Sequence, residues 1–197
     1  MKNKLEKLFL HPFEDHSDSA MLMVGLLAFG LMIVVSYLGN IVFDGIIQTH
    51  LAASEGWKII LGNISNVGIL TLGMYGIAKI LYPAVRLLDI LNNVLIARIP
   101  LLFLGLLTIP MQSLLPASDL TKDQVFAYFD NLNALQMLGL SAMAVAVLAL
   151  LIYFFYLLVV GVKHSINSKK AAHGFVIVLA TLLLDVLATF VYRSWFL

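Results

Sequence analysis

The uncharged stretch LQMLGLSAMAVAVLALLIYFFYLLVVGV, residues 135–162, decides which solvent surrounds this chain. A helix that crosses the hydrocarbon core of a bilayer needs about 20 predominantly apolar residues. This stretch exceeds that requirement and contains no Asp, Glu, Lys, Arg or His. We therefore predict a membrane-spanning helix here that either tilts in the bilayer or extends by a turn into the cytoplasm.

Four more apolar runs flank this stretch, so the chain is predicted to be an all-α integral membrane bundle with five transmembrane helices. The expected spans are residues 20–43, 59–81, 94–115, 135–162 and 175–192. They form one membrane domain, residues 20–197, behind a cytoplasmic arm of residues 1–19. The third run contains Arg98, Pro100 and Pro110, so we expect a kinked span there, with a re-entrant segment as the alternative.

The composition and the first run agree with this prediction. Apolar residues make up 61% of the chain and charged residues 12%, whereas soluble domains carry roughly 45–50% and about 25%. The run from Ala20 to Phe43 is longer than the apolar core of a signal peptide, about 7–15 residues, so we expect it to remain as a membrane anchor.

Lysine and arginine are divided unevenly between the two predicted sides. Of the 12 basic residues, nine fall on one side. These nine are Lys2, Lys4, Lys7, Lys79, Arg86, Arg98, Lys163, Lys169 and Lys170. The other side holds Lys58, Lys122 and Arg193. Because cytoplasmic loops carry the excess of basic residues, we expect the N-terminus in the cytoplasm and the C-terminus outside.

The arm before the first span has an amphipathic pattern. Leu5, Leu8 and Phe9 share one helical face, and Pro12 ends the pattern, which is typical of a short helix on the cytoplasmic membrane surface. The side chains that follow, His11, Glu14, Asp15 and His16, are of metal-ligating types. Since Pro12 interrupts a regular helix across them, we expect no metal site.

Asp185 is the foremost candidate for a functional residue, because it falls near the middle of the fifth predicted span. Thr181 and Thr189 lie four residues away on either side, so the three form a polar stripe that should face the bundle. A carboxylate at this depth is by default a functional hypothesis. It either relays protons or cations, with Arg98 as a possible partner, or fixes helix packing by hydrogen bonds.

The remaining candidates are one cation and three amides. Arg98 lies near the start of the third predicted span and either snorkels to the cytoplasmic headgroups or binds a lipid phosphate. Asn40, Asn63 and Asn66 fall in the outer halves of spans one and two. They either hydrogen-bond between helices or line a small hydrated cavity. Small residues such as Gly25 and Gly73 recur at helical spacing and favour close helix contacts.

Several classes of chemistry lack support in the sequence. The chain has no cysteine, which excludes disulfides, thiolate catalysis and cysteine zinc sites. No H-E-x-x-H, G-x-S-x-G or phosphate-binding glycine loop occurs. The formal net charge of +1 does not indicate a nucleic-acid partner. We therefore expect a protein that is not an enzyme and that needs no cofactor or metal.

Two short motifs accompany this five-span plan: Leu8-Phe9-Leu10-His11-Pro12-Phe13, and Val94-Leu95-Ile96-Ala97-Arg98-Ile99-Pro100. With them, the chain from Leu8 onward resembles the Yip (Ypt/Rab-interacting protein) domain family, in its bacterial branch. The D-L-Y-G-P stretch of the eukaryotic members is absent, so the resemblance does not imply GTPase binding.

The resemblance implies a polytopic protein of the bacterial inner membrane without catalytic activity, acting as a scaffold or organising factor through lipid or protein contacts. The bilayer is then the first partner, and a homo-oligomer or other membrane proteins are possible further ones. The alternative is a small ion- or proton-coupled transporter or channel subunit that uses Asp185.

Overall fold

Long helices dominate the computed structural model, which describes residues 13, 17–51, 55–114 and 122–196. They confirm the predicted all-α fold, and within these residues five segments are long and apolar enough to cross a membrane. The segments are α2 (Asp18–Leu38), α3 (Gly56–Leu81), α4 (Leu87–Ala97) together with α5 (Ile99–Met111), α7 (Ala134–Ser165) and α8 (Ala171–Phe196). The chain is thus an integral membrane protein.

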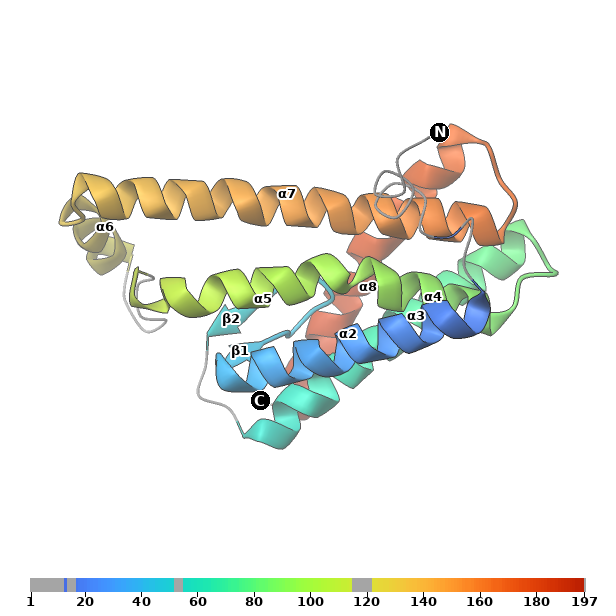
Figure 1. Ribbon diagram of the computed structural model, residues 1–197, viewed down its shortest axis with the longest axis horizontal. Helices are drawn as coiled ribbons and strands as arrows, with labels where there is room; N and C mark the ends of the chain where they lie inside the picture. Colours follow the sequence, from blue (N-terminus) through green and yellow to red (C-terminus); the bar gives the residue numbers. More distant parts are fainter. Residues whose placement is uncertain (1–12, 14–16, 52–54, 115–121, 197) are drawn as a thin grey trace.

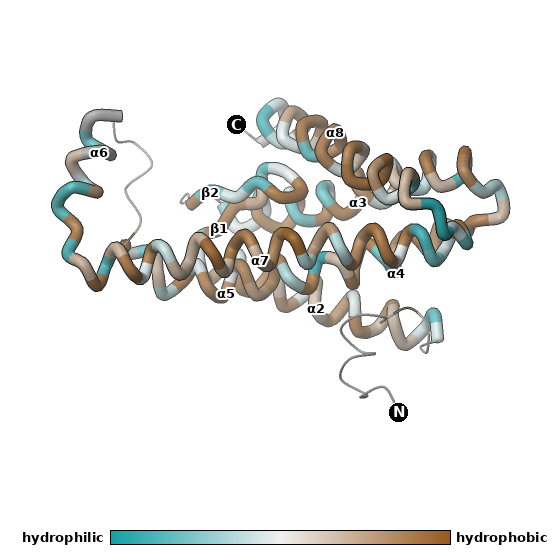
Figure 2. The backbone as a smooth tube through the Cα atoms, turned by 90° about the horizontal axis from the view of Figure 1, so that it is seen from above, coloured by the Kyte–Doolittle hydropathy of each residue, from teal (hydrophilic) through white to brown (hydrophobic). Residues whose placement is uncertain are grey.

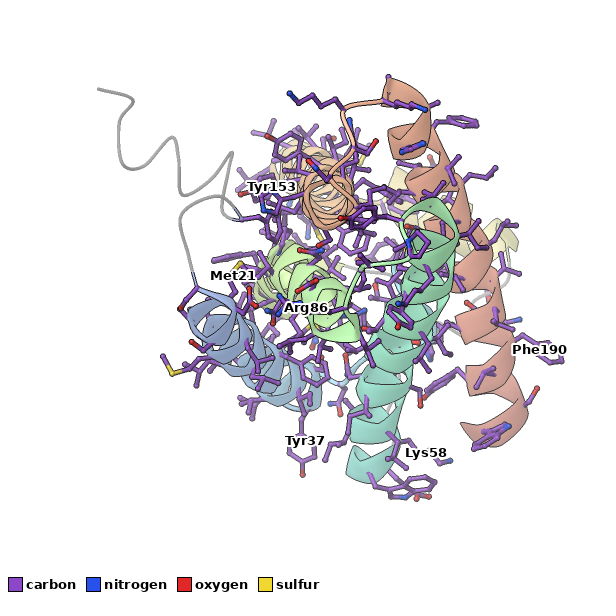
Figure 3. The ribbon with its side chains drawn as sticks, turned by 90° about the vertical axis from the view of Figure 1, so that its right-hand side faces the viewer. Met21, Tyr37, Lys58, Arg86, Tyr153 and Phe190 are labelled. Carbon is purple, nitrogen blue, oxygen red and sulfur yellow. The ribbon has the colours of Figure 1, made fainter. Side chains whose placement is uncertain are left out.

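The segment formed by α4 and α5 lies in the middle of the bundle. It packs against α2 on one side and α7 on the other, while α3 and α8 pack against each other and lie aslant to these helices (Figure 1). The outer faces are apolar, as in Phe190, which is 69% exposed and projects away from the bundle (Figure 3). Such surface is stable when hydrocarbon rather than water covers it.

Polar residues concentrate at the ends of the bundle (Figure 2). The short helix α6 (Lys122–Asp130) lies at one end, beyond the start of α7 and the 3-10 turn η1 (Gln112–Leu114) (Figure 1). Helix α7 has 32 residues, so its length of about 48 Å exceeds the roughly 30 Å of a hydrocarbon core. Asn133 starts it by accepting a hydrogen bond from the backbone of Gln136 at 2.9 Å.

Two of the small residues noted in the sequence bring helices close together. A Cβ at Gly25 in α2 would lie 2.7 Å from Leu95 Cβ in α4. A Cβ at Gly73 in α3 would lie 2.5 Å from the Leu184 side chain in α8. Glycine is therefore needed at both helix crossings, because a larger residue would push the helices apart.

The helices differ from the expected spans at two boundaries that matter for function. The first span was expected to reach Phe43, but α2 ends at Leu38. The third was expected to begin at Val94, but α4 begins at Leu87 and continues, with one break at Arg98, into α5. The third segment is therefore long enough to span, and the irregular backbone lies between α2 and α3 instead.

That irregular backbone carries the only strands of the described residues. Strands β1 (Ile41–Val42) and β2 (His50–Leu51) pair antiparallel, with Ile41 opposite Leu51 and Val42 opposite His50. Between them the chain turns back into the bundle beside α2 and α3. We name residues 41–51 the inserted loop.

Candidate functional site

The inserted loop is buried in the bundle although it is not helical. The side chains of Ile41, Phe43 and Ile46 are each at most 1% exposed. Non-helical backbone at membrane depth is tolerated only where protein or water satisfies its polar groups. The inserted loop therefore requires partners for its backbone, and the polar residues singled out in the sequence supply them.

Asn66 on α3 holds the first half of the inserted loop. Its Nδ2 donates to the carbonyl oxygens of Phe43 at 2.8 Å and Gly45 at 2.7 Å. At a rise of about 1.5 Å per residue, Asn66 lies about 15 Å from Gly56, where α3 starts. That distance is about half of the hydrocarbon thickness, so the inserted loop reaches toward the middle of the membrane.

Asp185 on α8 holds the second half. Its Oδ1 accepts a hydrogen bond from the backbone N–H of Ile47 at 2.9 Å, and its Oδ2 accepts one from Gln48 Nε2 at 3.4 Å. The residue is 6% exposed. A Cβ at Gly45 would lie 2.6 Å from Asp185 Oδ1, so only glycine lets the backbone approach this carboxylate so closely. Asp185 thus acts as an anchor for the inserted loop.

Arg98 approaches the inserted loop from the break between α4 and α5. Its guanidinium carbon lies 5.8 Å from the centre of the Phe43 ring, and its Nη2 lies 4.0 Å from Met32 Sδ. The residue is 2% exposed, and Nε and Nη1 have no hydrogen-bond partner within the described chain. The break follows from Pro100, which has no N–H to continue the helix.

This placement corrects the interpretation of Arg98 as a snorkelling residue. Because α4 begins at Leu87, Arg98 lies about 17 Å along the span rather than near the end at which the span starts. Its side chain packs inside the bundle, so it does not count among the basic residues that were expected on the cytoplasmic side. No ion pair joins Arg98 to Asp185 in the part of the chain that is described. The excess of basic residues on that side persists without it.

The other sequence candidates have separate roles. Asn63 is 1% exposed, and its Nδ2 donates to the Ile59 carbonyl of its own helix at 2.9 Å. Asn40 is exposed and adopts a φ of 47°, so it terminates α2 in a left-handed conformation that asparagine tolerates. The predicted stripe on α8 faces the bundle, where Thr181 is fully buried. The structure thus brings Asn66, Asp185 and Arg98 to the inserted loop, and leaves Asn40 and Asn63 aside.

Sequence reasoning missed the residues of the inserted loop itself. Asp44 Oδ1 lies 3.5 Å from His50 Nδ1, and this pair closes the hairpin where β2 returns. The pairs Gly39-Asn40 and Asp44-Gly45 are turn-forming combinations. They were the available signal that the apolar run from Ala20 does not continue as one helix to Phe43.

The site can hold a loop in place, and its geometry assigns it no reaction. Among the described residues, no group of three or more metal-ligating side chains comes together. The cluster of His11, Glu14, Asp15 and His16 lies outside the described residues, as does most of the amphipathic arm. No family model, curated protein or solved structure matches this chain, and the Yip-domain resemblance stays a prediction.

Proposed function

We propose that this protein is a non-catalytic membrane scaffold that acts through contacts with lipids or other membrane proteins. The observation that supports this proposal is the role of Asp185. Both of its carboxylate oxygens bind the inserted loop. A proton or cation relay needs a carboxylate that exchanges its partner with water or with a second ionisable group. Here the Asp185 carboxylate accepts hydrogen bonds that hold the inserted loop in place.

The outer surface supports the same proposal. Large apolar side chains cover the outward faces of the spans, such as Leu27 on α2, Leu138 on α7 and Leu183 on α8, each more than 60% exposed. These faces fit the bilayer and, as further partners, a second copy or another membrane protein. We place the protein in a bacterial inner membrane with its N-terminus in the cytoplasm, as the basic residues and the Yip resemblance suggest.

The proposal is tested by ion flux in liposomes. The purified protein is reconstituted in vesicles that contain a pH-sensitive dye, and an imposed proton or sodium gradient is followed for the unmodified chain and for Asp185→Asn. We expect the same leak as in empty vesicles for both. A flux that the unmodified chain supports and that Asp185→Asn abolishes would contradict the scaffold proposal.

The second candidate function is a small transporter or channel subunit, and Arg98 is the observation that favours it. Helices that break near the middle of the membrane are typical of transport proteins, where they surround a substrate site. Here a buried guanidinium lies at such a break, and two of its nitrogens have no hydrogen-bond partner among the described residues. The flux assay with a chloride gradient and Arg98→Gln decides this case, because an anion path through Arg98 predicts a flux that this variant abolishes.

A further inference from the structure

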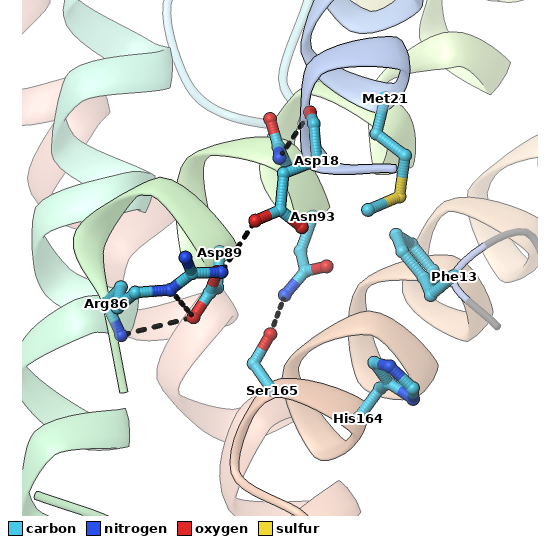
Figure 4. A pocket seen from close by; sticks show the side chains of 9 residues that line it. Phe13, Asp18, Met21, Arg86, Asp89, Asn93, His164 and Ser165 are labelled. Atoms are coloured by element: carbon cyan, nitrogen blue, oxygen red, sulfur yellow. Dashed lines mark hydrogen bonds and ion pairs between the residues drawn. The ribbon is translucent and has the colours of Figure 1, made fainter. Parts of the chain in front are cut away.

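A second polar site lies far from the inserted loop, in a cavity of about 340 Å³ between α2, α4 and α7 (Figure 4). Its volume is within the range of small-ligand pockets, about 300–1,000 Å³. Polar and charged side chains line most of it, among them Asp18, Arg86, Asp89, Asn93, His164 and Ser165. None of these residues contributes to the site described above.

The cavity lies at the level where lipid headgroups meet the protein. Asp18 is the first residue of α2, Leu87 begins α4, and Ser165 is the last residue of α7. Three spans therefore start or end around the cavity. By the distribution of basic residues, this is the cytoplasmic end of the bundle.

Among the described residues that line the cavity, one carboxylate lacks a full counter-charge. Arg86 Nη2 lies 2.6 Å from Asp18 Oδ2 and 2.6 Å from Asp89 Oδ1. One guanidinium thus serves two carboxylates. The hydrogen bonds of Asp89 and Asp18 raise the pKa of Arg86 above its ordinary value, so the residue keeps its charge. A second cation from a ligand would complete the pairing, whereas a purely anionic ligand would meet an excess of negative charge.

The opposite wall of the cavity offers hydrogen-bond donors. Ser165 Oγ accepts a hydrogen bond from Asn93 Nδ2 at 2.8 Å, and no hydrogen bond donated by its O–H is found within the described residues, so the O–H can donate to a ligand. His164 lies beside it. On the α4 side, Asn92 is 1% exposed and also lines the cavity, and its Oδ1, a hydrogen-bond acceptor, has no partner within the described residues. The site therefore presents acidic groups on the α2 and α4 side and donors on the α7 side.

An apolar stripe leads from the cavity along α2. Met21 lines the cavity, and Val24, Ala28 and Leu31 follow on the same helical face. Val24 and Leu31 are 48% and 57% exposed. Acyl chains of a lipid can lie along this stripe while its headgroup occupies the cavity.

We infer that this cavity binds the headgroup of a phospholipid with a primary ammonium, such as phosphatidylethanolamine. The ammonium pairs with Asp18 and Asp89, and the phosphate accepts hydrogen bonds from Ser165 and His164. The inference rests on the proposed lipid-contacting function and names the lipid class. It does not depend on the result of the flux assay.

The test is lipid retention measured by native mass spectrometry. The delipidated protein is mixed with equal amounts of phosphatidylethanolamine, phosphatidylcholine and phosphatidylglycerol that share the same acyl chains. Phosphatidylcholine is the matched probe, because its quaternary ammonium has the same charge but no N–H to donate. We expect phosphatidylethanolamine to be retained about tenfold more than either other lipid, since a charge-assisted hydrogen bond contributes about that factor.

Variants locate the site. Asp18→Asn should remove the preference, while Asp130→Asn, an exposed acid on α6 at the other end of the bundle, should keep it. Equal retention of phosphatidylethanolamine and phosphatidylcholine by the unmodified chain would overturn the inference, and this comparison requires no variant to fold. A preference that survives Asp18→Asn, or stronger binding of phosphatidylglycerol, would also overturn it. Free phosphoethanolamine that binds as tightly as the lipid would overturn the assignment to a lipid.

Discussion

Asn63 and Asn66 lie one helical turn apart on α3 and are equally buried, yet they bond to different parts of the fold. Asn66 donates to two carbonyls of the inserted loop, whereas Asn63 donates only to its own helix. Leucine has the same branching at Cγ as asparagine, but it is larger and makes no hydrogen bond. Removing Asn66 therefore leaves two buried carbonyls without a partner, and each such group costs about 1–3 kcal/mol.

We expect Asn66→Leu to lower the free energy of unfolding by about 2 kcal/mol or more, and Asn63→Leu to change it by less than about 1 kcal/mol. Within the described residues the Asn63 Oδ1 lacks a partner, so its loss removes the cost of an unsatisfied oxygen as well as a hydrogen bond. Thermal unfolding in mild detergent measures both variants, with Asn63→Leu as the matched control. Equal destabilisation of the two would contradict the role given to Asn66.

Arg98 is a buried cation whose Nε and Nη1 have no partner in the described chain. Methionine fills a similar space without a charge, and apolar residues that replace buried ions are often neutral or stabilising by about 1–4 kcal/mol. We expect Arg98→Met to be at least as stable as the unmodified protein in the same unfolding assay, and Arg98→Lys to be less stable than Arg98→Met. A strong loss of stability in Arg98→Met would mean that Arg98 binds an anion in the membrane.

The inserted loop is the element on which the candidate site depends. Gly45 passes so close to α8 that a Cβ there would lie 2.6 Å from Asp185 Oδ1 and 2.8 Å from Thr189 Oγ1. We expect Gly45→Ala to displace the inserted loop and to lower the melting temperature by several degrees, because about 1 kcal/mol corresponds to roughly 2–4 °C in a domain of this size.

Gly68→Ala is the matched control for this prediction. A Cβ at Gly68 would meet no atom within 4 Å, and the residue lies inside α3. Alanine in a helix is favoured over glycine by about 0.8–1.0 kcal/mol, so this variant should keep or raise the melting temperature. If Gly45→Ala behaved like Gly68→Ala, the close approach of the inserted loop to Asp185 would be wrong.

The sequence predicted helical elements better than it predicted the inserted loop, for a physical reason. Ile41, Val42 and Phe43 are apolar and directly continue the first span, and a hydropathy pattern does not distinguish lipid from a protein interior as their surroundings. The start of the third span was placed too late for the opposite reason. Asn92 and Asn93 look too polar for a membrane helix, but they bond to Asp18 and Ser165 at its end.

Three of the five polar residues that were singled out in the sequence contact the inserted loop, and the loop itself was not predicted. A polar residue inside an apolar run can be recognised from a single sequence, and its placement in the membrane costs free energy. Asp185, Arg98 and Asn66 were identified in this way. Their common partner was not visible, because it is the backbone of the inserted loop, which carries no signature in side-chain types. The depth of Arg98 in the membrane is counted from the start of the third span. Because that start was predicted too late in the sequence, Arg98 was placed too close to the end of the span.

The fold consists of five membrane crossings with the inserted loop enclosed between them. Three crossings, formed by α3, by α4 with α5, and by α7, separate the start of α3 from the connection between α7 and α8, so these two points lie on opposite sides of the membrane. The basic residues predict that the connection between α7 and α8 faces the cytoplasm. Since the chain has no cysteine, a single introduced thiol reports unambiguously on any chosen position.

Cysteine accessibility tests this claim most directly, with Glu55→Cys before α3, Ser168→Cys between α7 and α8, and Ile46→Cys in the inserted loop. In intact cells, a membrane-impermeant maleimide should label Glu55→Cys and leave Ser168→Cys unlabelled until the cells are opened. Ile46→Cys should react only after denaturation, because Ile46 is fully buried. Labelling of Glu55→Cys and Ser168→Cys from the same side would contradict the five crossings, and labelling of Ile46→Cys in intact cells would contradict the burial of the inserted loop.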